Sequence, residues 1–308
     1  MSLKYAVIGA GAVGGYFGGR LAYAGNDVHF LFNSDYNHVQ QNGLKIDSVN
    51  DTYFLKHVNA YSSTSDMPQV DVVLVGLKTT NNHLIKVMLK PILKDDTLII
   101  LIQNGIGAEE VLQKELPDRR IAGGLAFICS EKTGPGYIKH IDHGSLTLAS
   151  MNKDDDPTVK AVCADFENAG ISCKFSDDLK TARWQKLVWN APFNGMTVVL
   201  NTTTDAIMNN EGTRKLAYDI MQEVITGANA CGAKLPNDFA DKMMYSTLHM
   251  KPYATSMKVD FDNKRALEID ALYTKPISYA AECGFSMKKV EVLEKQLHFI
   301  NEKNLSEG

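Results

Sequence analysis

Short apolar segments alternate with amphipathic segments along the chain from Lys4 to about Phe175. Short runs that are mostly apolar predict buried parallel strands, and the segments between them predict helices. Strands and helices that alternate in this way predict an α/β fold with a doubly wound parallel sheet, covered by helices on both faces. The clearest strands are residues 4–8, 28–32, 70–77, 97–102, 121–127 and 172–175.

Strand signals disappear after Asp177-Asp178, and the rest of the chain has helical periodicity with polar breaks near residues 201–205, 232–236 and 260–264. We therefore predict an N-terminal sheet domain, residues 1–177, followed by an all-α C-terminal domain, residues 178–308. The length of 308 residues agrees with two domains, because a domain commonly takes roughly 150 residues.

Residues 134–149 depart from the alternation of strands and helices. A Gly-Pro-Gly turn precedes two short runs, residues 137–141 and 145–149, which Asp142-His143-Gly144 joins. This pattern predicts an antiparallel hairpin at the edge of the sheet. Asp154-Asp155-Asp156-Pro157 then predicts the start of another helix, because proline and acidic residues favour the first helical turn.

A glycine-rich sequence follows the first predicted strand directly. Gly9 permits a tight strand-to-helix turn, Gly11 lets the backbone approach a pyrophosphate, and Gly14 allows the helix to pack closely on the strand. The N–H groups at the start of the next helix can bind the anion. A structural glycine turn is the alternative, but the strand, helix and second strand around it favour a Rossmann-type dinucleotide site. Its cofactor-binding residues are Gly9, Ala10, Gly11, Ala12, Val13 and Gly14.

The tip of the second strand is where a dinucleotide fold binds the ribose 2′-hydroxyl of NAD with an acid, or the 2′-phosphate of NADP with a base. The tip here is Phe32-Asn33-Ser34-Asp35. Asn33 and Ser34 can donate hydrogen bonds but carry no charge, and Asp35 stands two positions later than a ribose-binding carboxylate should. This site does not decide between NAD and NADP.

Two further loops follow predicted strands at the carboxyl edge of the sheet, where open α/β sheets bind ligands. Lys78 brings a cation to the first loop, and Asn104 brings an amide to the second. A solvated lysine and a simple Asn-Gly turn are the alternatives. Their shared position at the edge that carries the glycine loop favours ligand binding.

Lys186, Asn190 and Asn194 are spaced four apart in an otherwise apolar stretch that begins the helical domain. On a helix they share one face. A desolvated lysine has a lowered pKa, which suits a general acid that protonates a carbonyl oxygen. The alternative is a lysine that extends to solvent beside two exposed asparagines. Pro192 should kink or end the helix, which would place Asn194 past a bend and out of line with Lys186 and Asn190.

A second polar group of the helical domain comprises Ser256 and Glu268. Ser256 stands in Thr255-Ser256-Met257-Lys258-Val259-Asp260, and Glu268 stands near the start of a predicted helix. An ordinary helix hydroxyl and a helix-cap carboxylate at the surface are the alternatives to a functional role.

Composition excludes several classes of protein. The net charge of −4, with 32 basic and 36 acidic residues dispersed, argues against a nucleic-acid partner. Five cysteines without a C-x-x-C pair indicate neither a disulfide framework nor a zinc site. We find no signal peptide and no apolar run near the roughly 20 residues of a membrane span, so we expect a cytoplasmic protein without a membrane partner. His140 and His143 should point to opposite faces, so we expect no metal site.

Five segments in order resemble the ketopantoate reductase family, the 2-dehydropantoate 2-reductases of pantothenate biosynthesis, over nearly the whole chain. They are the glycine loop, Leu77-Lys78, Gln103-Asn104-Gly105, Lys186-Leu187-x-x-Asn190-x-x-x-Asn194, and Ser256-Met257-x-x-Asp260 followed by Glu268-Ile269-Asp270.

The resemblance implies a role for each matching residue. The lysine matching Lys186 is the general acid, and the glutamate matching Glu268 helps to hold the ligands and orients that lysine. Residues matching Asn190, Asn194 and Ser256 bind the hydroxyl and carboxylate of the substrate. Residues matching Lys78 and Asn104 serve the nicotinamide side of the site, with Asn104 at the substrate as well.

The activity that the resemblance implies is NADPH-dependent reduction of 2-dehydropantoate, a small 2-oxo acid, to (R)-pantoate, in a cleft between the two domains. Asn33 departs from the arginine common in NADP-preferring members, so NAD stays open. Two alternatives also stay open: a reductase or dehydrogenase of another small 2-oxo or 3-hydroxy acid, and a non-catalytic dinucleotide-binding redox sensor. Monomer and homodimer are both compatible with the sequence.

Overall fold

Every apolar run predicted in the N-terminal part of the chain forms a strand in the computed structural model, which describes residues 2–252 and 254–306. These confirmed strands are β1 (Lys4–Ile8), β2 (Asp27–Leu31), β6 (Val70–Val75), β7 (Leu93–Leu101), β8 (Arg120–Gly134) and β10 (Cys173–Phe175). The structure adds β3 (Leu44–Ser48), β4 (Thr52–Leu55), β5 (Asn59–Tyr61) and β9 (Tyr137–Ser150).

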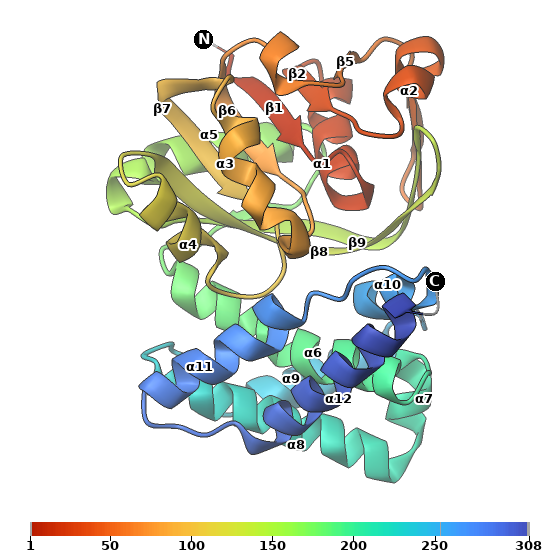
Figure 1. Ribbon diagram of the computed structural model, residues 1–308, viewed down its shortest axis with the longest axis vertical. Helices are drawn as coiled ribbons and strands as arrows, with labels where there is room; N and C mark the ends of the chain where they lie inside the picture. The colour runs from red at the N-terminus through yellow and green to blue at the C-terminus, as the bar shows by residue number, and fades with distance from the viewer. Residues whose placement is uncertain (1, 253, 307–308) are drawn as a thin grey trace. The chain divides into compact units, whose positions relative to one another are not determined.

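The chain divides into two compact units. The first contains the chain up to Gln103 together with Ala108–Leu179, and the second contains Asn104–Gly107 together with the chain from Lys180 onward. The first unit carries the sheet, and the elements of the second unit, green to blue in Figure 1, are helices within the described residues.

The strands of the first unit form one ten-stranded sheet. Its order is β4-β3-β9-β8-β7-β6-β1-β2-β5, with β10 paired to β9. The pairs from β8 through β7, β6, β1 and β2 to β5 are parallel. The pairs β8–β9 and β3–β4 are antiparallel. The sheet is therefore parallel where the dinucleotide motif lies and mixed toward its far edge.

Helices cover both faces of this sheet because the strand residues alternate between two apolar layers. Tyr5 and Val7 of β1 join one core cluster with α1 (Ala12–Tyr23) and α5 (Asp156–Asn168), whereas Ala6 and Ile8 join another with α3 (Ile85–Leu89) and α4 (Ala108–Glu115). This arrangement confirms the doubly wound fold. A further helix, α2 (Tyr36–Asn42), contacts β5.

The predicted hairpin within residues 137–149 is wrong. Both runs belong to the single long strand β9, which pairs along its length with β8. The Asp142-His143-Gly144 segment is an irregularity inside β9, where His143 and Gly144 have φ values of 61° and 110° and the register shifts. The Gly-Pro-Gly sequence makes the turn between β8 and β9. Since β9 also pairs with β3, it lies inside the sheet and not at its edge.

The second unit is helical, as predicted. Its helices are α6 (Leu179–Val199), α7 (Thr204–Asn209), α8 (Glu211–Ala230), α9 (Phe239–His249), α10 (Ser256–Asp262), a π-helical turn (Asp270–Thr274), α11 (Lys275–Glu282) and α12 (Lys288–Ser306). The break predicted near residues 232–236 lies between α8 and α9, whereas those predicted near residues 201–205 and 260–264 overlap the start of α7 and the end of α10. Trp184, Phe193 and Tyr273 are among the buried side chains that form one apolar core. Across residues 2–252 and 254–306, no helix has the length and apolar character of a membrane span.

Candidate active site

The glycine loop lies where two neighbouring strands end and the chain leaves the sheet in opposite directions. β1 lies between β2 and β6 in the sheet, so its carboxyl end is a topological switch point, the usual ligand position in open α/β sheets. The Gly76 N–H donates to the Ile8 carbonyl at 2.8 Å, which fixes the loop after β6 beside the loop after β1.

Close backbone contacts require glycine at two of the three positions in this loop, Gly9 and Gly14. Gly9 has φ of 87°, and a Cβ there would lie 2.7 Å from the Leu77 nitrogen. A Cβ at Gly14 would overlap the Gly9 carbonyl oxygen. A Cβ at Gly11 would meet no atom within 4 Å, so this glycine faces open space. The loop therefore forms a closed turn with one backbone surface open to a ligand.

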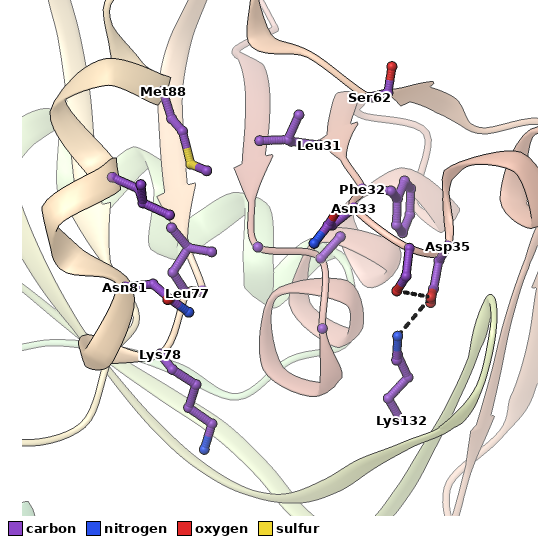
Figure 2. A pocket seen from close by; sticks show the side chains of 16 residues that line it. Leu31, Phe32, Asn33, Asp35, Ser62, Leu77, Lys78, Asn81, Met88 and Lys132 are labelled. Carbon is purple, nitrogen blue, oxygen red and sulfur yellow. Dashed lines mark hydrogen bonds and ion pairs between the residues drawn. The ribbon is translucent and has the colours of Figure 1, made fainter. Parts of the chain in front are cut away.

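A cavity of about 460 Å³ opens at the glycine loop, within the size range of small-molecule sites. Five of the predicted cofactor residues line it: Gly9, Ala10, Gly11, Asn33 and Lys78. Ala12, Val13 and Gly14 begin helix α1 next to it. In Figure 2, Lys78 and Asn81 lie on one side of the view of this pocket, and Asp35 and Lys132 lie on the other.

The charged tip of this pocket is an ion pair that the sequence does not predict. Asp35 is only 5% exposed, and its carboxylate accepts hydrogen bonds from Lys132 Nζ at 2.7 Å and the Gly136 N–H at 3.2 Å. Burial raises the pKa of Asp35, but the Lys132 ammonium and the Gly136 N–H outweigh it, so the pKa lies below its ordinary value. Asp35 is therefore a carboxylate held by its own protein partners.

Gln103 fixes the loop that carries Asn104. Its Nε2 donates to the Leu77 carbonyl at 2.8 Å and to Asn82 Oδ1 at 2.7 Å, which joins the loops after β6 and β7. Asn104 is partly buried and begins the short segment that belongs to the second unit. Within that unit, the Ile106 N–H donates to the Ala271 carbonyl at 3.2 Å. Asn104 is thus in the same unit as Lys186 and Glu268.

Helix α6 presents the three predicted polar residues with helical spacing and continues past Pro192 to Val199. The expectation that Pro192 would kink or end the helix near Asn194 is wrong in its second part: the residues on both sides belong to one 21-residue helix. The Tyr273 hydroxyl donates to the Ala191 carbonyl at 2.9 Å, which gives the backbone beside the proline an added partner.

Asn194 is 1% exposed and fixes the start of helix α10. Its Oδ1 accepts a hydrogen bond from the Met257 N–H at 3.2 Å and one at 3.5 Å from Ser256 Oγ. Thr197, one turn further along α6, bonds to Thr255 at 2.8 Å between hydroxyl oxygens. Asn194 and Ser256 are therefore brought together, and only the Nδ2 group of Asn194 remains to donate to a ligand.

Asn190 presents a buried donor. The residue is 7% exposed, and its Nδ2 makes no hydrogen bond to any residue in the described ranges. A buried donor left without an acceptor costs about 1–3 kcal/mol. A ligand oxygen would remove this cost, so Asn190 has the character of a binding group.

Lys186 is partly buried and has a strongly altered acidity. Desolvation lowers the pKa of Lys186 most, the Arg183 guanidinium lowers it further, and the Glu268 carboxylate opposes both, with a net pKa of about 7. A lysine of this kind exchanges its proton near neutral pH, as a general acid must.

Glu268 is buried, with 5% of its surface exposed, so the alternative of a surface helix cap is wrong. Its neighbours Leu267 and Ile269 are both buried in the apolar core, and the Leu267 N–H donates to Asn301 Oδ1 of α12 at 3.0 Å. These anchors hold Glu268 at the position from which it acts on Lys186.

Sequence reasoning missed Arg183 and Lys132. Arg183 is 5% exposed and stands three residues before Lys186, a spacing that places two residues on neighbouring positions of a helix. That signal was available in the sequence. Lys132 is 97 residues from Asp35, and no local pattern connects them.

Groups of three or more metal-ligating side chains are absent from the described part of the chain. His140 uses Nδ1 for Ser48 Oγ at 2.8 Å, and its Nε2 donates to the Asp142 and His143 carbonyls, both at 3.0 Å. His140 therefore has a structural role, because its hydrogen bonds hold the irregular segment of β9.

The parallel sheet, the glycine loop at its switch point and the helical second unit with Lys186 and Glu268 define the class: a pyridine-nucleotide-dependent oxidoreductase. Two family models match the chain, "Ketopantoate reductase PanE/ApbA" over residues 5–153 and "Ketopantoate reductase PanE/ApbA C terminal" over residues 178–301. The chain belongs to the ketopantoate reductase family.

Individual relatives agree with this family. The 2-dehydropantoate 2-reductase of Nostoc sp. (strain PCC 7120) is 44% identical over 306 residues, which are 98% of this chain and 96% of that protein. The crystal structure of 2-dehydropantoate 2-reductase from Geobacter metallireducens GS-15 has a TM-score of 0.93 and 39% identity, covering 96% of this chain and 99% of that one. D-mandelate dehydrogenase, solved with NADH and anilino(oxo)acetate, shares the fold at 21% identity and a TM-score of 0.87, covering 98% and 99%.

Proposed function

We propose that this protein reduces 2-dehydropantoate to (R)-pantoate with NADPH. The observation that carries the proposal is the buried Glu268 carboxylate, whose negative charge opposes the lowering of the Lys186 pKa. Asn190 lies one turn beyond Lys186 on helix α6. This set of groups suits the reduction of a 2-oxo acid, and the relative of 44% identity carries the name of this enzyme. The substrate is a small molecule with a carboxylate next to a ketone.

The pocket at the glycine loop fits a dinucleotide. Gly11 leaves backbone exposed where a side chain would otherwise stand, and the start of helix α1 offers N–H groups to a pyrophosphate. Gly9, Ala10, Gly11, Ala12, Val13 and Gly14 would hold the phosphates, with Asn33 toward the adenosine and Lys78, Asn104 and Glu268 toward the nicotinamide. When bound, NADPH supplies the hydride that reduces the keto carbon.

Lys186 supplies the proton in this reaction. Reduction forms a C–H bond at the keto carbon and breaks the carbonyl π bond, so the oxygen must take a proton as negative charge develops on it. The Lys186 ammonium donates that proton and becomes neutral, and solvent protonates it again before the next turnover. Its pKa of about 7 makes both states accessible near neutral pH.

The other groups bind and orient the substrate. The Asn190 Nδ2 donates to a substrate oxygen, which gives this buried donor a partner. The Asn194 Nδ2, the Ser256 hydroxyl and the Asn104 amide bind the carboxylate and hydroxyl groups. Glu268 positions the Lys186 ammonium by its negative charge and accepts from the substrate hydroxyl. Such positioning converts the reaction into one within a fixed complex.

Steady-state assays with a substrate panel test the proposal. We expect loss of reduced-nicotinamide absorbance with 2-dehydropantoate, faster with NADPH than with NADH, and much slower turnover of smaller and aromatic 2-oxo acids. Turnover restricted to a different 2-oxo acid would keep the chemistry and replace the substrate. Tight dinucleotide binding without turnover of any 2-oxo acid would contradict the enzymatic function.

A further inference from the structure

The pocket in the first unit contains a cation at its adenosine end that does not come from the strand β2. The residue after Phe32 is Asn33, which carries no charge. Lys132, on the distant strand β8, extends to this tip and lines the same pocket as Gly11 and Asn33. Figure 2 shows its ammonium pointing toward Asp35.

Asp35 holds Lys132 in place and is itself fully engaged. Oδ1 accepts from Lys132 Nζ at 2.7 Å and from Ser34 Oγ at 3.0 Å, while Oδ2 accepts from the Gly136 N–H at 3.2 Å. A carboxylate with these three donors is not available to bind a ribose 2′-hydroxyl, and its charge is balanced by the ammonium. The arrangement therefore lacks the feature that selects NAD.

The turn between β8 and β9 fixes the Gly136 N–H beside Asp35 without any contribution from Lys132. The Lys45 N–H of β3 donates to the Gly136 carbonyl at 2.9 Å, and Gly136 has φ of 62°. A Cβ at Gly136 would lie 2.9 Å from the Gly43 carbonyl oxygen. The backbone of this turn therefore contacts both Asp35 and β3, which limits the positions available to the Lys132 side chain.

We infer that Lys132 binds the 2′-phosphate of NADPH and so determines the preference for NADPH over NADH, with Asp35 as its positioning residue. This inference rests on the part of the proposed function that assigns a nicotinamide dinucleotide to the pocket. It gives a cation from β8 the task that a basic residue at the tip of β2 performs in other dinucleotide folds.

The chemistry of the ammonium supports this assignment. A lysine ammonium has three N–H donors, and Asp35 takes one, which leaves two for phosphate oxygens. Asn33 is exposed beside it and can donate through its amide. The Lys132 side chain is 38% exposed, enough to meet a ligand without large movement. The lysine ammonium binds phosphate as a compact point charge, as it does in other phosphate sites.

The test compares binding of 2′,5′-ADP and 5′-AMP, two adenosine fragments that differ in the 2′-phosphate, by isothermal titration calorimetry. The variants are Lys132→Gln, Lys132→Arg and the control Lys139→Gln, which removes an exposed lysine of the same hairpin that does not line the pocket. Circular dichroism verifies the fold of each variant.

We expect wild type to bind 2′,5′-ADP more tightly than 5′-AMP, and Lys132→Gln to lose about tenfold in affinity for 2′,5′-ADP alone. A charge-assisted hydrogen bond corresponds to roughly 10- to 150-fold, and the exposure of Lys132 favours the lower end. Lys132→Arg should retain most of the preference, and Lys139→Gln should retain all of it. Equal loss in the two lysine-to-glutamine variants, or no loss in Lys132→Gln, overturns the inference.

These fragments also separate this inference from the proposed function. A protein that discriminates the two fragments through Lys132 but does not reduce 2-dehydropantoate supports the inference and contradicts the substrate assignment. A protein that reduces 2-dehydropantoate but binds both fragments equally overturns the inference and leaves the reaction intact.

Discussion

Glu268 is buried in the same unit as Lys186, and its carboxylate favours the charged form of the lysine. Two stronger influences oppose it. Burial lowers the pKa of Lys186 most, and the Arg183 guanidinium lowers it further, so that the net value is about 7 against an ordinary 10.5. The balance among these three residues gives the first two predictions.

The rate of keto-acid reduction should fall as pH rises through about 7. Lys186 must be protonated to donate, and a group with this pKa is mostly protonated below 7 and mostly neutral above it. We expect kcat/KM for 2-dehydropantoate to decline by about tenfold per pH unit on the alkaline side. The reverse oxidation needs neutral Lys186 and should rise through the same pH. A forward rate that stays level to pH 9 would contradict the acid role.

Removing the charge of Arg183 and removing that of Glu268 should shift the midpoint of the pH profile in opposite directions. Arg183→Met removes a positive charge and should raise the midpoint of the forward profile, whereas Glu268→Gln should lower it. Both variants also lose rate, so the midpoint is the informative quantity. Lys180→Met, which removes an exposed lysine of α6, is the control and should leave the midpoint unchanged. Shifts in the same direction for both variants would show that they act through general disturbance of the site.

Asn194 should contribute to stability as well as to binding. Asn194→Ala removes the acceptor of the buried Met257 N–H and should lower the free energy of unfolding by about 1–3 kcal/mol. Ser256→Ala loses only a 3.5 Å hydrogen bond at an exposed position and should cost less than about 1 kcal/mol. Chemical denaturation of the two variants makes the comparison. Equal losses would mean that Asn194 does not hold the start of α10.

Gly9 and Gly25 offer a matched test of the glycine loop. Both have positive φ, 87° and 89°, but an added Cβ would lie 2.7 Å from the Leu77 nitrogen at Gly9 and meet nothing within 4 Å at Gly25. Gly25→Ala should therefore cost about 1 kcal/mol from backbone strain alone. Gly9→Ala should add about 1–3 kcal/mol from overpacking and abolish dinucleotide binding. Thermal unfolding measures the loss of stability, and NADPH fluorescence measures dinucleotide binding. Normal NADPH binding by Gly9→Ala would contradict the role of the glycine loop in holding the dinucleotide.

The parallel strands and the glycine loop were predictable from sequence because their signals are local. Residues 5–8 are a continuous apolar run, and a glycine sequence follows at once. The strand β9 was not predictable in the same way. Polar residues at 142–144 have the composition of a turn, but pairing with β8 continues through Asp142 and His143, and β3 pairs with the part of β9 before them. Tertiary pairing overrides the local signal there.

In the candidate site, too, local signals were predictable from the sequence and long-range contacts were not. Helical spacing places Lys186, Asn190 and Asn194 together, and the family motif adds Ser256 and Glu268. The burial of Glu268 could not be predicted, because its anchors on α12 are more than 30 residues away.

The partnership of Lys132 with Asp35 depends on a contact between β8 and the tip of β2. Only the folded sheet brings these segments together, so the tip appeared from sequence to have no positive charge.

The most direct test is a parallel assay of wild type and Lys186→Ala with 2-dehydropantoate and NADPH, with Lys180→Ala as the control. We predict that Lys186→Ala loses about 10²- to 10⁴-fold in kcat, the usual contribution of a general acid, while its circular dichroism and NADPH binding match wild type. Lys180→Ala should keep full turnover. A folded Lys186→Ala variant that retained most of its kcat would contradict the assignment of Lys186 as the proton donor.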